Sequence, residues 1–365
     1  MLSNFAAPVR FDEFMHFALY HPNLGYYAGG QHIFGQTGDF ITAPELGPLF
    51  GQTLGQAIAG VLPRCRGVIT EFGAGSGQLA CDVLSVVGHA IEQYCIVEVS
   101  GGLQLAQRER LAKQLPTEMM NKVRWLSALP DTLEGIVIGN EVLDATPVRR
   151  FKWTSQGVLE AWVQTQNNQL TWRWLPADAT LTARANTLQQ VHGPWPEGYT
   201  SEWAEQAEGL MRTLTERLHG LALMVDYGHE AALYYAPHRT QGTLRATLKH
   251  VAHDDFLKHI GEQDLTAHVD FTAMYNALSQ AGGQLEGYTT QAEFLMGHGI
   301  LERAARLPTW CEPVQGARTR QAINTLLSET DMGLNFKVLA WSKGVDLEGT
   351  DLNRVFVHHD QSGRL

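Results

Sequence analysis

Cysteine is scarce in this sequence, and its spacing excludes the usual cysteine-based scaffolds. The four cysteines, Cys65, Cys81, Cys95 and Cys311, lie far apart and form no CxxC pair. We therefore expect neither a structural zinc site nor a disulfide framework. Buried free thiols in a reducing compartment are the favoured interpretation.

Long apolar runs are also missing. No stretch reaches the roughly 18 uninterrupted apolar residues that a membrane-spanning helix needs. The first 27 residues show no positively charged segment followed by an apolar one, which is the pattern of a secretory signal peptide. We therefore expect a cytoplasmic protein.

The sequence has no surplus of basic residues. Acidic residues number 38 against 27 basic ones, so the formal net charge is -11. This balance argues against a nucleic-acid-binding protein that relies on a broad basic face, and it weakly favours a cationic partner. The 365 residues suffice for one large domain or two moderate ones with a real core.

Strand and helix patterns alternate through the middle of the chain. This alternation predicts an α/β fold with a mostly parallel sheet and crossover helices. The predicted strands cover residues 67–72, 94–100, 123–126, 135–140 and 222–228, and the predicted helices cover residues 79–87, 103–115 and 202–219. Two final antiparallel strands are predicted over residues 284–291 and 335–343.

The segments around this core have different patterns. Residues 11–20 and 52–61 have helical spacing, and residues 21–51 are dense in glycine, proline and aromatics. Residues 151–176 alternate tryptophan and valine with polar residues, which predicts an antiparallel hairpin. We therefore predict an N-terminal extension and lid (1–66), a core (67–150 and 220–345) and an inserted β hairpin with helices (151–219).

The stretch ITEFGAGSGQLA, residues 69–80, places a glycine-rich turn between a strand and a helix. A dinucleotide fingerprint has a third glycine at position 78, but this chain has Gln78, and Gly77 comes one residue early. The GxGxG spacing suits a ligand without a pyrophosphate, such as S-adenosylmethionine. A glycine-rich turn that binds no ligand is the alternative.

Acidic residues flank this turn. Glu71 precedes Gly73 by two residues, and it would repel a pyrophosphate but attract the cationic part of a sulfonium ligand. Glu98 ends the next strand, where an acid can accept hydrogen bonds from both hydroxyls of a ribose. Because NAD enzymes use the same kind of acid, Glu98 alone leaves an NAD-dependent oxidoreductase open.

Polar residues follow the strand that ends near residue 140. Asn140, Glu141 and Asp144 lie where open α/β sheets bind ligands. Carboxylates match a guanidinium bidentately and can aim one of its nitrogens at a methyl group. The loop is not an Asn-Pro-Pro-aromatic tetrad, which lowers the case for base or amide methylation. Asp144 as a helix cap or a solvated side chain is the alternative.

Other polar positions allow weaker interpretations. Residues 38–45 can form a lid over the donor or a packed arm in which Thr42 or Glu45 caps a helix. Asp226 ends a strand and can line the acceptor side or serve only as a loop carboxylate. Arg245 can bind the acceptor or pair structurally. His250, His253 and His259 suggest a metal, but no third ligand is set by spacing, and we expect no metal.

Eight motifs resemble the MidA-like family of class I S-adenosylmethionine-dependent methyltransferases. In chain order they occupy residues 38–51, 71–80, 96–107, 138–151, 224–228, 242–250, 264–271 and 333–343, nearly the whole chain. Two sites depart from the family pattern. Residues 100–103 read Ser-Gly-Gly-Leu in place of Ser-Pro-x-Leu, and residues 246–248 lack the usual aromatics after Gly-Thr-Leu-Arg, which affects the expected substrate pocket.

The resemblance implies a Rossmann-like, seven-stranded sheet with one antiparallel strand and S-adenosylmethionine as the donor. Its characterised mitochondrial branch methylates protein arginine, so a protein substrate such as a respiratory-complex subunit is expected. A homodimer and a location in the bacterial cytoplasm are separate expectations. A non-catalytic assembly factor that binds the donor is the second hypothesis. The expected catalytic residues are Glu141, Asp144 and Asp226; the donor-binding residues are Glu71, Gly73, Gly75, Gly77, Glu98, Val99 and Asn140; the substrate and lid residues are Asp39, Thr42, Pro44, Glu45 and Arg245.

Overall fold

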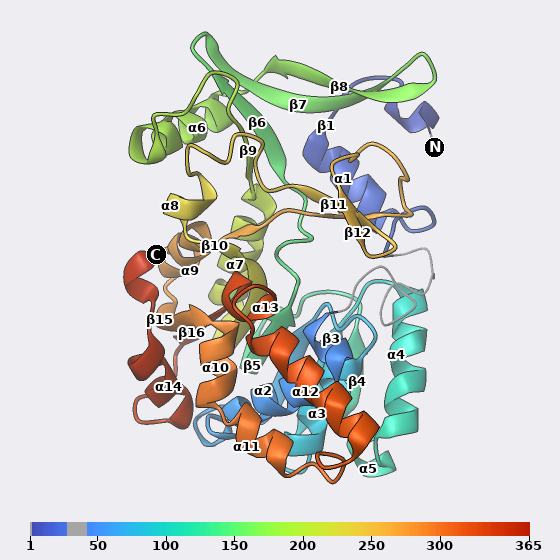
Figure 1. Ribbon diagram of the computed structural model, residues 1–365, viewed down its shortest axis with the longest axis vertical. Helices are drawn as coiled ribbons and strands as arrows, with labels where there is room; N and C mark the ends of the chain where they lie inside the picture. Colours follow the sequence, from blue (N-terminus) through green and yellow to red (C-terminus); the bar gives the residue numbers. More distant parts are fainter. Residues whose placement is uncertain (1, 28–41) are drawn as a thin grey trace. The chain divides into compact units, whose positions relative to one another are not determined.

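A computed structural model describes residues 2–27 and 42–365, which divide into two compact units (Figure 1). Unit 1 takes its described residues from 1–31, 143–210 and 228–274. Unit 2 takes its described residues from 32–142, 211–227 and 275–365. The predicted domain division at residues 66, 150 and 219 stays a prediction, since it groups the chain by expected role.

Unit 2 contains a mostly parallel sheet. Its strand order is β15–β16–β10–β5–β2–β3–β4, and β16 runs antiparallel to both of its neighbours. This confirms the predicted α/β fold with its mostly parallel sheet. The strands are β2 (Val68–Phe72), β3 (Gln93–Val97), β4 (Val123–Leu126), β5 (Leu133–Asn140), β10 (Leu218–His229), β15 (Gln284–Thr290) and β16 (Phe336–Lys343).

Helices pack on this sheet and bury its central strands. Nearly every residue of β5 and β10 is buried, as expected for parallel strands covered on both faces. In the described part of the chain, no helix is both long and apolar enough to cross a bilayer. The helices of unit 2 are α2 (Leu49–Ala59), α3 (Gln78–Val87), α4 (Gly101–Gln114), α5 (Thr117–Met120), α10 (Gln291–Gly297), α11 (Ile300–Ala305), α12 (Pro313–Leu327), α13 (Met332–Asn335) and α14 (Asp351–His359), with 3-10 turns η2 (Ala43–Leu46), η3 (Leu62–Arg64) and η4 (Ser362–Arg364).

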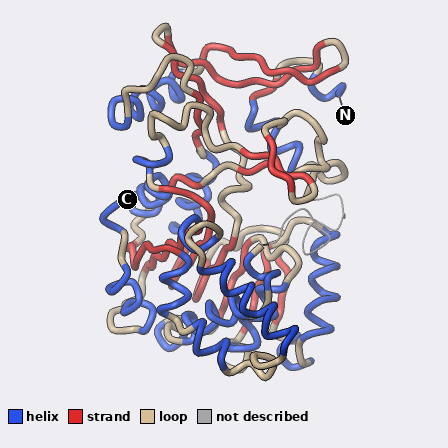
Figure 2. Tube along the Cα trace, in the orientation of Figure 1, coloured by secondary structure: helices blue, strands red, loops and turns tan. Residues whose placement is uncertain are grey.

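Unit 1 is built on antiparallel strands. The order β1–β7–β6–β9, with β8 paired to β7, includes the predicted hairpin, which Figure 2 shows as a long two-stranded ribbon. Its turn uses Asn167 and Asn168 at φ values of 51° and 59°, the left-handed conformation of a tight hairpin. The strands are β1 (Val9–Arg10), β6 (Arg149–Thr154), β7 (Gly157–Gln166), β8 (Gln169–Pro176) and β9 (Thr200–Trp203).

The rest of unit 1 consists of helices and short strands. A second small sheet has the order β12–β11–β13, and β14 pairs in parallel with the last two residues of β10. Among the described residues, the central sheet with β14 has eight strands, one more than the seven predicted. The elements are η1 (Leu2–Phe5), α1 (Phe11–Tyr20), α6 (Ala179–His192), α8 (Ala231–Tyr234), β11 (Arg245–Leu248), β12 (Val251–His253), β13 (Asp264–Thr266) and β14 (Val269–Asp270); α7 (Glu205–Arg217) and α9 (Phe271–Gln280) run from unit 1 into unit 2.

One helix boundary was predicted wrongly. The helix predicted from residue 202 begins at Glu205, because Glu202 lies in β9, fully buried against Arg150 and the main-chain N–H of Thr243. Of the histidines that suggested a metal, His253 lies in the strand β12, and His250 lies outside the helices with a φ of 63°.

Candidate functional site

The glycine-rich turn joins β2 to α3 in unit 2. Gly73, Gly75 and Gly77 have φ values of 62°, 50° and 83°, in the left-handed region that glycine adopts without strain. A Cβ at Gly73 would lie 3.0 Å from Cγ2 of Val142, and one at Gly77 would lie 2.7 Å from Cδ1 of Leu111. Both glycines are therefore needed for conformation and for space.

Glu98 lies directly after β3, as predicted. Its Oε1 accepts a hydrogen bond from the main-chain N–H of Ser100 at 2.8 Å, and its Oε2 accepts one from Nε2 of Gln107 at 3.2 Å. Burial raises the pKa of the Glu98 carboxyl, and these hydrogen bonds oppose that rise. The next residue, Val99, is 75% exposed. The carboxylate of Glu98, fixed by two hydrogen bonds, is thus followed in the chain by the exposed apolar side chain of Val99.

Gln107 is a site residue that the sequence reasoning missed. Its side chain is fully buried on α4 and contacts the glycine turn through the carbonyl oxygen of Gly75, at 2.9 Å. One signal was available: Leu103, Gln107 and Leu111 are spaced four residues apart, so a polar residue occupies the buried stripe of the helix.

Glu71 points away from solvent, and its side chain is 1% exposed. The hydroxyl of Tyr94 donates a hydrogen bond to its Oε2 at 2.7 Å. Burial raises the pKa of Glu71 to about 8, so this carboxyl is mostly protonated at neutral pH. Its assignment as a donor-binding residue stays a prediction.

The raised pKa of Glu71 makes stability depend on pH. Between its ordinary value of 4.5 and about 8, the folded state keeps a proton that the unfolded state releases, so stability falls as pH rises through this window. Glu71→Gln stays neutral and is expected to lose less stability than the natural protein between about pH 5.5 and about pH 8.5. Urea unfolding at the two pH values measures this difference.

A control separates this effect from other buried acids. Asp82, whose pKa burial raises to about 7, is present in both proteins and adds the same trend to each. Glu109→Gln, an exposed change on α4, should keep the natural pH profile. Equal losses in Glu71→Gln and the natural protein would contradict the assigned protonation.

The loop after β5 is held in an unusual conformation. Glu141 has a φ of 54°, rare for a residue other than glycine, and its N–H donates to the carbonyl of Val225 at 2.9 Å. The carboxylate of Asp226 accepts hydrogen bonds from the N–H groups of Val142, at 3.0 Å, and Tyr227, at 2.8 Å. Asp226 therefore fixes this loop, and its catalytic role stays a prediction.

Asn140 ends β5 beside this loop. Its Nδ2 donates to Oε1 of Glu141 at 3.0 Å, while its buried Oδ1 has no hydrogen-bond partner among residues 2–27 and 42–365. A buried acceptor without a donor is costly unless a ligand supplies one. The amino group of S-adenosylmethionine is such a donor, and the pyrophosphate of NAD offers no N–H, so the residues present fit the sulfonium compound.

The predicted lid residues are partly described. Asp39 lies outside the described residues. Thr42 precedes η2 without a side-chain cap, and Pro44 is buried. Glu45 hydrogen-bonds the hydroxyl of Ser76 in the glycine turn and forms an ion pair with Arg110 of α4 at 2.9 Å. Glu45 thus ties this segment to the turn.

Unit 1 contains the remaining predicted residues. Burial raises the pKa of Tyr27, and the negative charges of Asp264 and, to a smaller extent, Asp144 raise it further. The hydroxyl of Tyr27 donates a hydrogen bond to Asp264 at 3.0 Å. The ring of Tyr27 stacks on that of Tyr20 at 5.5 Å. Arg245, by contrast, is exposed and lies 3.4 Å from Asp254. The structure therefore brings Asp144 within electrostatic range of Tyr27, which the sequence did not predict.

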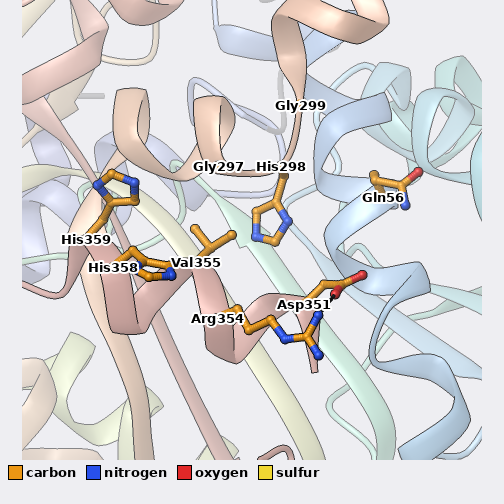
Figure 3. A pocket seen from close by; sticks show the side chains of 9 residues that line it. All are labelled: Gln56, Gly297, His298, Gly299, Asp351, Arg354, Val355, His358 and His359. Atoms are coloured by element: carbon orange, nitrogen blue, oxygen red, sulfur yellow. Dashed lines mark hydrogen bonds and ion pairs between the residues drawn. The ribbon is translucent and has the colours of Figure 1, made fainter. Parts of the chain in front are cut away.

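A surface cavity of about 500 Å³ lies elsewhere in unit 2 (Figure 3). Asp351 and Arg354 pair there at 3.3 Å, and burial lowers the pKa of His298 to about 4, so this imidazole is neutral. Of the described residues that line the cavity, none is a predicted site residue; they are Gln56, Gly297, His298, Gly299, Asp351, Arg354, Val355, His358 and His359.

Three relatives resemble this chain over nearly its whole length. A crystal structure of a likely methyl transferase from Burkholderia thailandensis, bound to S-adenosyl-homocysteine, is 38% identical, with a TM-score of 0.90, and the match covers 98% of this chain and 92% of that one. The Caenorhabditis elegans protein arginine methyltransferase NDUFAF7 homolog, mitochondrial, is 29% identical, covering 92% of this chain and 83% of that protein. The human protein arginine methyltransferase NDUFAF7, mitochondrial, is 28% identical, covering 94% and 82%.

A family described as putative S-adenosyl-L-methionine-dependent methyltransferase matches residues 53–289, well over half of the chain. This match confirms the resemblance and the predicted donor, and it leaves the NAD-dependent alternative without support. With the glycine turn, the acid after β3 and the unpartnered oxygen of Asn140, it shows that the chain belongs to this family of methyltransferases, with S-adenosylmethionine as the methyl donor.

Proposed function

We propose that this methyltransferase transfers a methyl group to an arginine guanidinium of a protein. The observation that carries the proposal is Glu141, a carboxylate held at a φ of 54° on the loop that contacts the glycine turn. Strained conformations of this kind persist where function requires them. The Caenorhabditis elegans and human relatives are named protein arginine methyltransferases, which supports the same substrate class.

The chemistry of a guanidinium explains why carboxylates are needed. Bound S-adenosylmethionine supplies an electrophilic methyl group. Glu141 and, three residues further along the chain, Asp144 pair with the N–H groups of the guanidinium, keep its charge on the far nitrogens and orient the near nitrogen. A carboxylate oxygen of Glu141 accepts the proton that the methylated nitrogen releases.

Aromatic side chains near Asp144 support a planar cationic substrate. Within unit 1, the rings of Tyr20 and Tyr27 stack, the hydroxyl of Tyr27 donates to Asp264, and the charge of Asp144 contributes to the raised pKa of Tyr27. Aromatic faces attract a guanidinium, and carboxylates bind its edge. This combination favours arginine over a neutral acceptor such as a hydroxyl or an amide.

The same proposal assigns roles to the residues on the donor side. Glu98 accepts hydrogen bonds from the ribose hydroxyls, and Val99 packs on the adenine. Oδ1 of Asn140 accepts a hydrogen bond from the amino group of the donor, and the three glycines let the main chain approach it. Glu45, Thr42 and Pro44 form the lid side, and Arg245 contacts the acceptor.

The substrate protein, the oligomeric state and the cellular location are proposals as well. A respiratory-complex subunit is the proposed substrate, which the likeness to the mitochondrial relatives supports. A homodimer is the proposed oligomeric state. The bacterial cytoplasm is the proposed location, which fits the free state of the four cysteines.

Comparative mass spectrometry tests the proposal. Cells that lack the protein are complemented with the natural gene, with Glu141→Gln or with an empty vector, and their methylated peptides are compared. A methylarginine mark that returns only with the natural gene is expected. A mark restored equally by Glu141→Gln, or no dependent arginine mark at all, would favour the non-catalytic assembly factor.

A further inference from the structure

We infer that Gln107 is a positioning residue for donor binding, whose single amide holds the glycine turn and Glu98 in one fixed arrangement. The inference rests on the proposed role of Glu98, and no acceptor residue takes part in it. Gln107 lies on α4, which Figure 1 shows beside β3 and β4.

Three elements meet at this side chain. Nε2 of Gln107 donates to the carbonyl oxygen of Gly75 at 2.9 Å and to Oε2 of Glu98 at 3.2 Å. Oε1 of Gln107 accepts a hydrogen bond from Nε1 of Trp125, in β4, at 2.9 Å. One amide therefore links the turn after β2, the end of β3 and the neighbouring strand.

The orientation of the amide is fixed by chemistry. An indole N–H can only donate, so the group facing Trp125 must be the carbonyl oxygen of Gln107. The amino group then faces Gly75 and Glu98 and supplies one N–H to each. The guanidinium of Arg108 lies 3.9 Å from the centre of the Trp125 ring, which fixes the indole in turn.

Only a neutral side chain with both a donor and an acceptor completes this arrangement. An apolar replacement removes the partner of the carbonyl of Gly75, of Oε2 of Glu98 and of the indole N–H, and it leaves Glu98 only its hydrogen bond from Ser100. An acidic replacement of the same shape places a second carboxylate against Glu98, and the two repel each other when both are ionised. The two changes therefore have different pH signatures.

The test measures S-adenosylhomocysteine binding by calorimetry and donor KM and kcat in three variants of the full chain. Gln107→Leu is expected to bind about tenfold or more weakly, because a hydrogen bond to a charged group is lost, with the KM raised more than kcat is lowered. Gln107→Glu is expected to bind more weakly at about pH 8.5 than at about pH 5.5, beyond any trend of the natural protein.

Gln104→Leu is the matched control. Gln104 lies one turn earlier on α4, and its side chain donates to the main-chain carbonyl of Glu98 at 2.7 Å. The variant therefore loses a hydrogen bond near the site but keeps the contacts of Gln107 with the Glu98 carboxylate and with the glycine turn. It should bind the ligand as the natural protein does.

Two results would overturn the inference. One is natural affinity in Gln107→Leu, and the other is a Gln107→Glu protein whose affinity follows the natural pH profile. If Gln107→Leu does not fold, Gln107→Glu still decides, since it keeps the shape of the side chain. Failure of the arginine proposal leaves these binding results untouched, because the assay contains no acceptor.

Discussion

Glu98→Ala is expected to weaken S-adenosylhomocysteine binding by about 100-fold. A carboxylate that accepts two hydrogen bonds from ribose hydroxyls contributes more than neutral acceptors do, and alanine leaves both hydroxyls without that partner. Titration calorimetry measures the dissociation constant directly. The burial of Glu98 strengthens the effect, because water screens a buried charge poorly.

The control for this prediction is another acidic residue of unit 2. Glu109→Ala changes an exposed carboxylate of α4 and should leave the affinity unchanged. Thermal unfolding of each variant without ligand reports whether the lost hydrogen bond from Ser100 has altered the fold. Natural affinity in a folded Glu98→Ala protein would refute the assignment of this residue.

Glu141→Gln is expected to lower kcat by about 100- to 1000-fold, because the negative charge of Glu141 stabilises the reacting guanidinium. The affinity for the donor is expected to stay close to that of the natural protein. The glutamine keeps the shape of the side chain but cannot accept the released proton. Steady-state methylation of an arginine-containing substrate, together with calorimetry of the donor, separates the two quantities.

Asp144→Asn extends this prediction. If Glu141 and Asp144 act on one guanidinium, the double variant should lose less than the product of the two single losses. Glu134→Gln, an exposed change at the opposite end of β5 that disturbs only the pairing with Arg66, serves as the control. A loss in donor affinity equal to the loss in kcat would place Glu141 on the donor side instead.

Local sequence patterns predicted the parallel sheet and the glycine-rich turn after β2. Buried runs such as residues 135–140 and the GxGxG spacing depend on neighbours in the sequence, so they can be recognised there. The turn between Asn167 and Asn168 is local for the same reason. The parallel sheet in unit 2 and the antiparallel hairpin in unit 1 confirm these predictions.

The features that the sequence did not predict depend on contacts between residues that lie far apart in the chain. Glu202 lies in a strand because Arg150 and Thr243, far away in the chain, surround its carboxylate. Gln107 contacts Gly75 across 32 positions of sequence, and no spacing rule indicates such a pair. The left-handed conformation of Glu141 depends on its contact with β10.

Residue-level analysis of the methylated product tests the central claim most directly. The purified natural protein is incubated with S-adenosylmethionine carrying an isotope-labelled methyl group and with an extract of cells that lack the protein, and the labelled protein is hydrolysed to amino acids. The account predicts that the label is recovered in methylarginine, and that Glu141→Gln transfers almost none. Label recovered in another amino acid, with none in methylarginine, would contradict it.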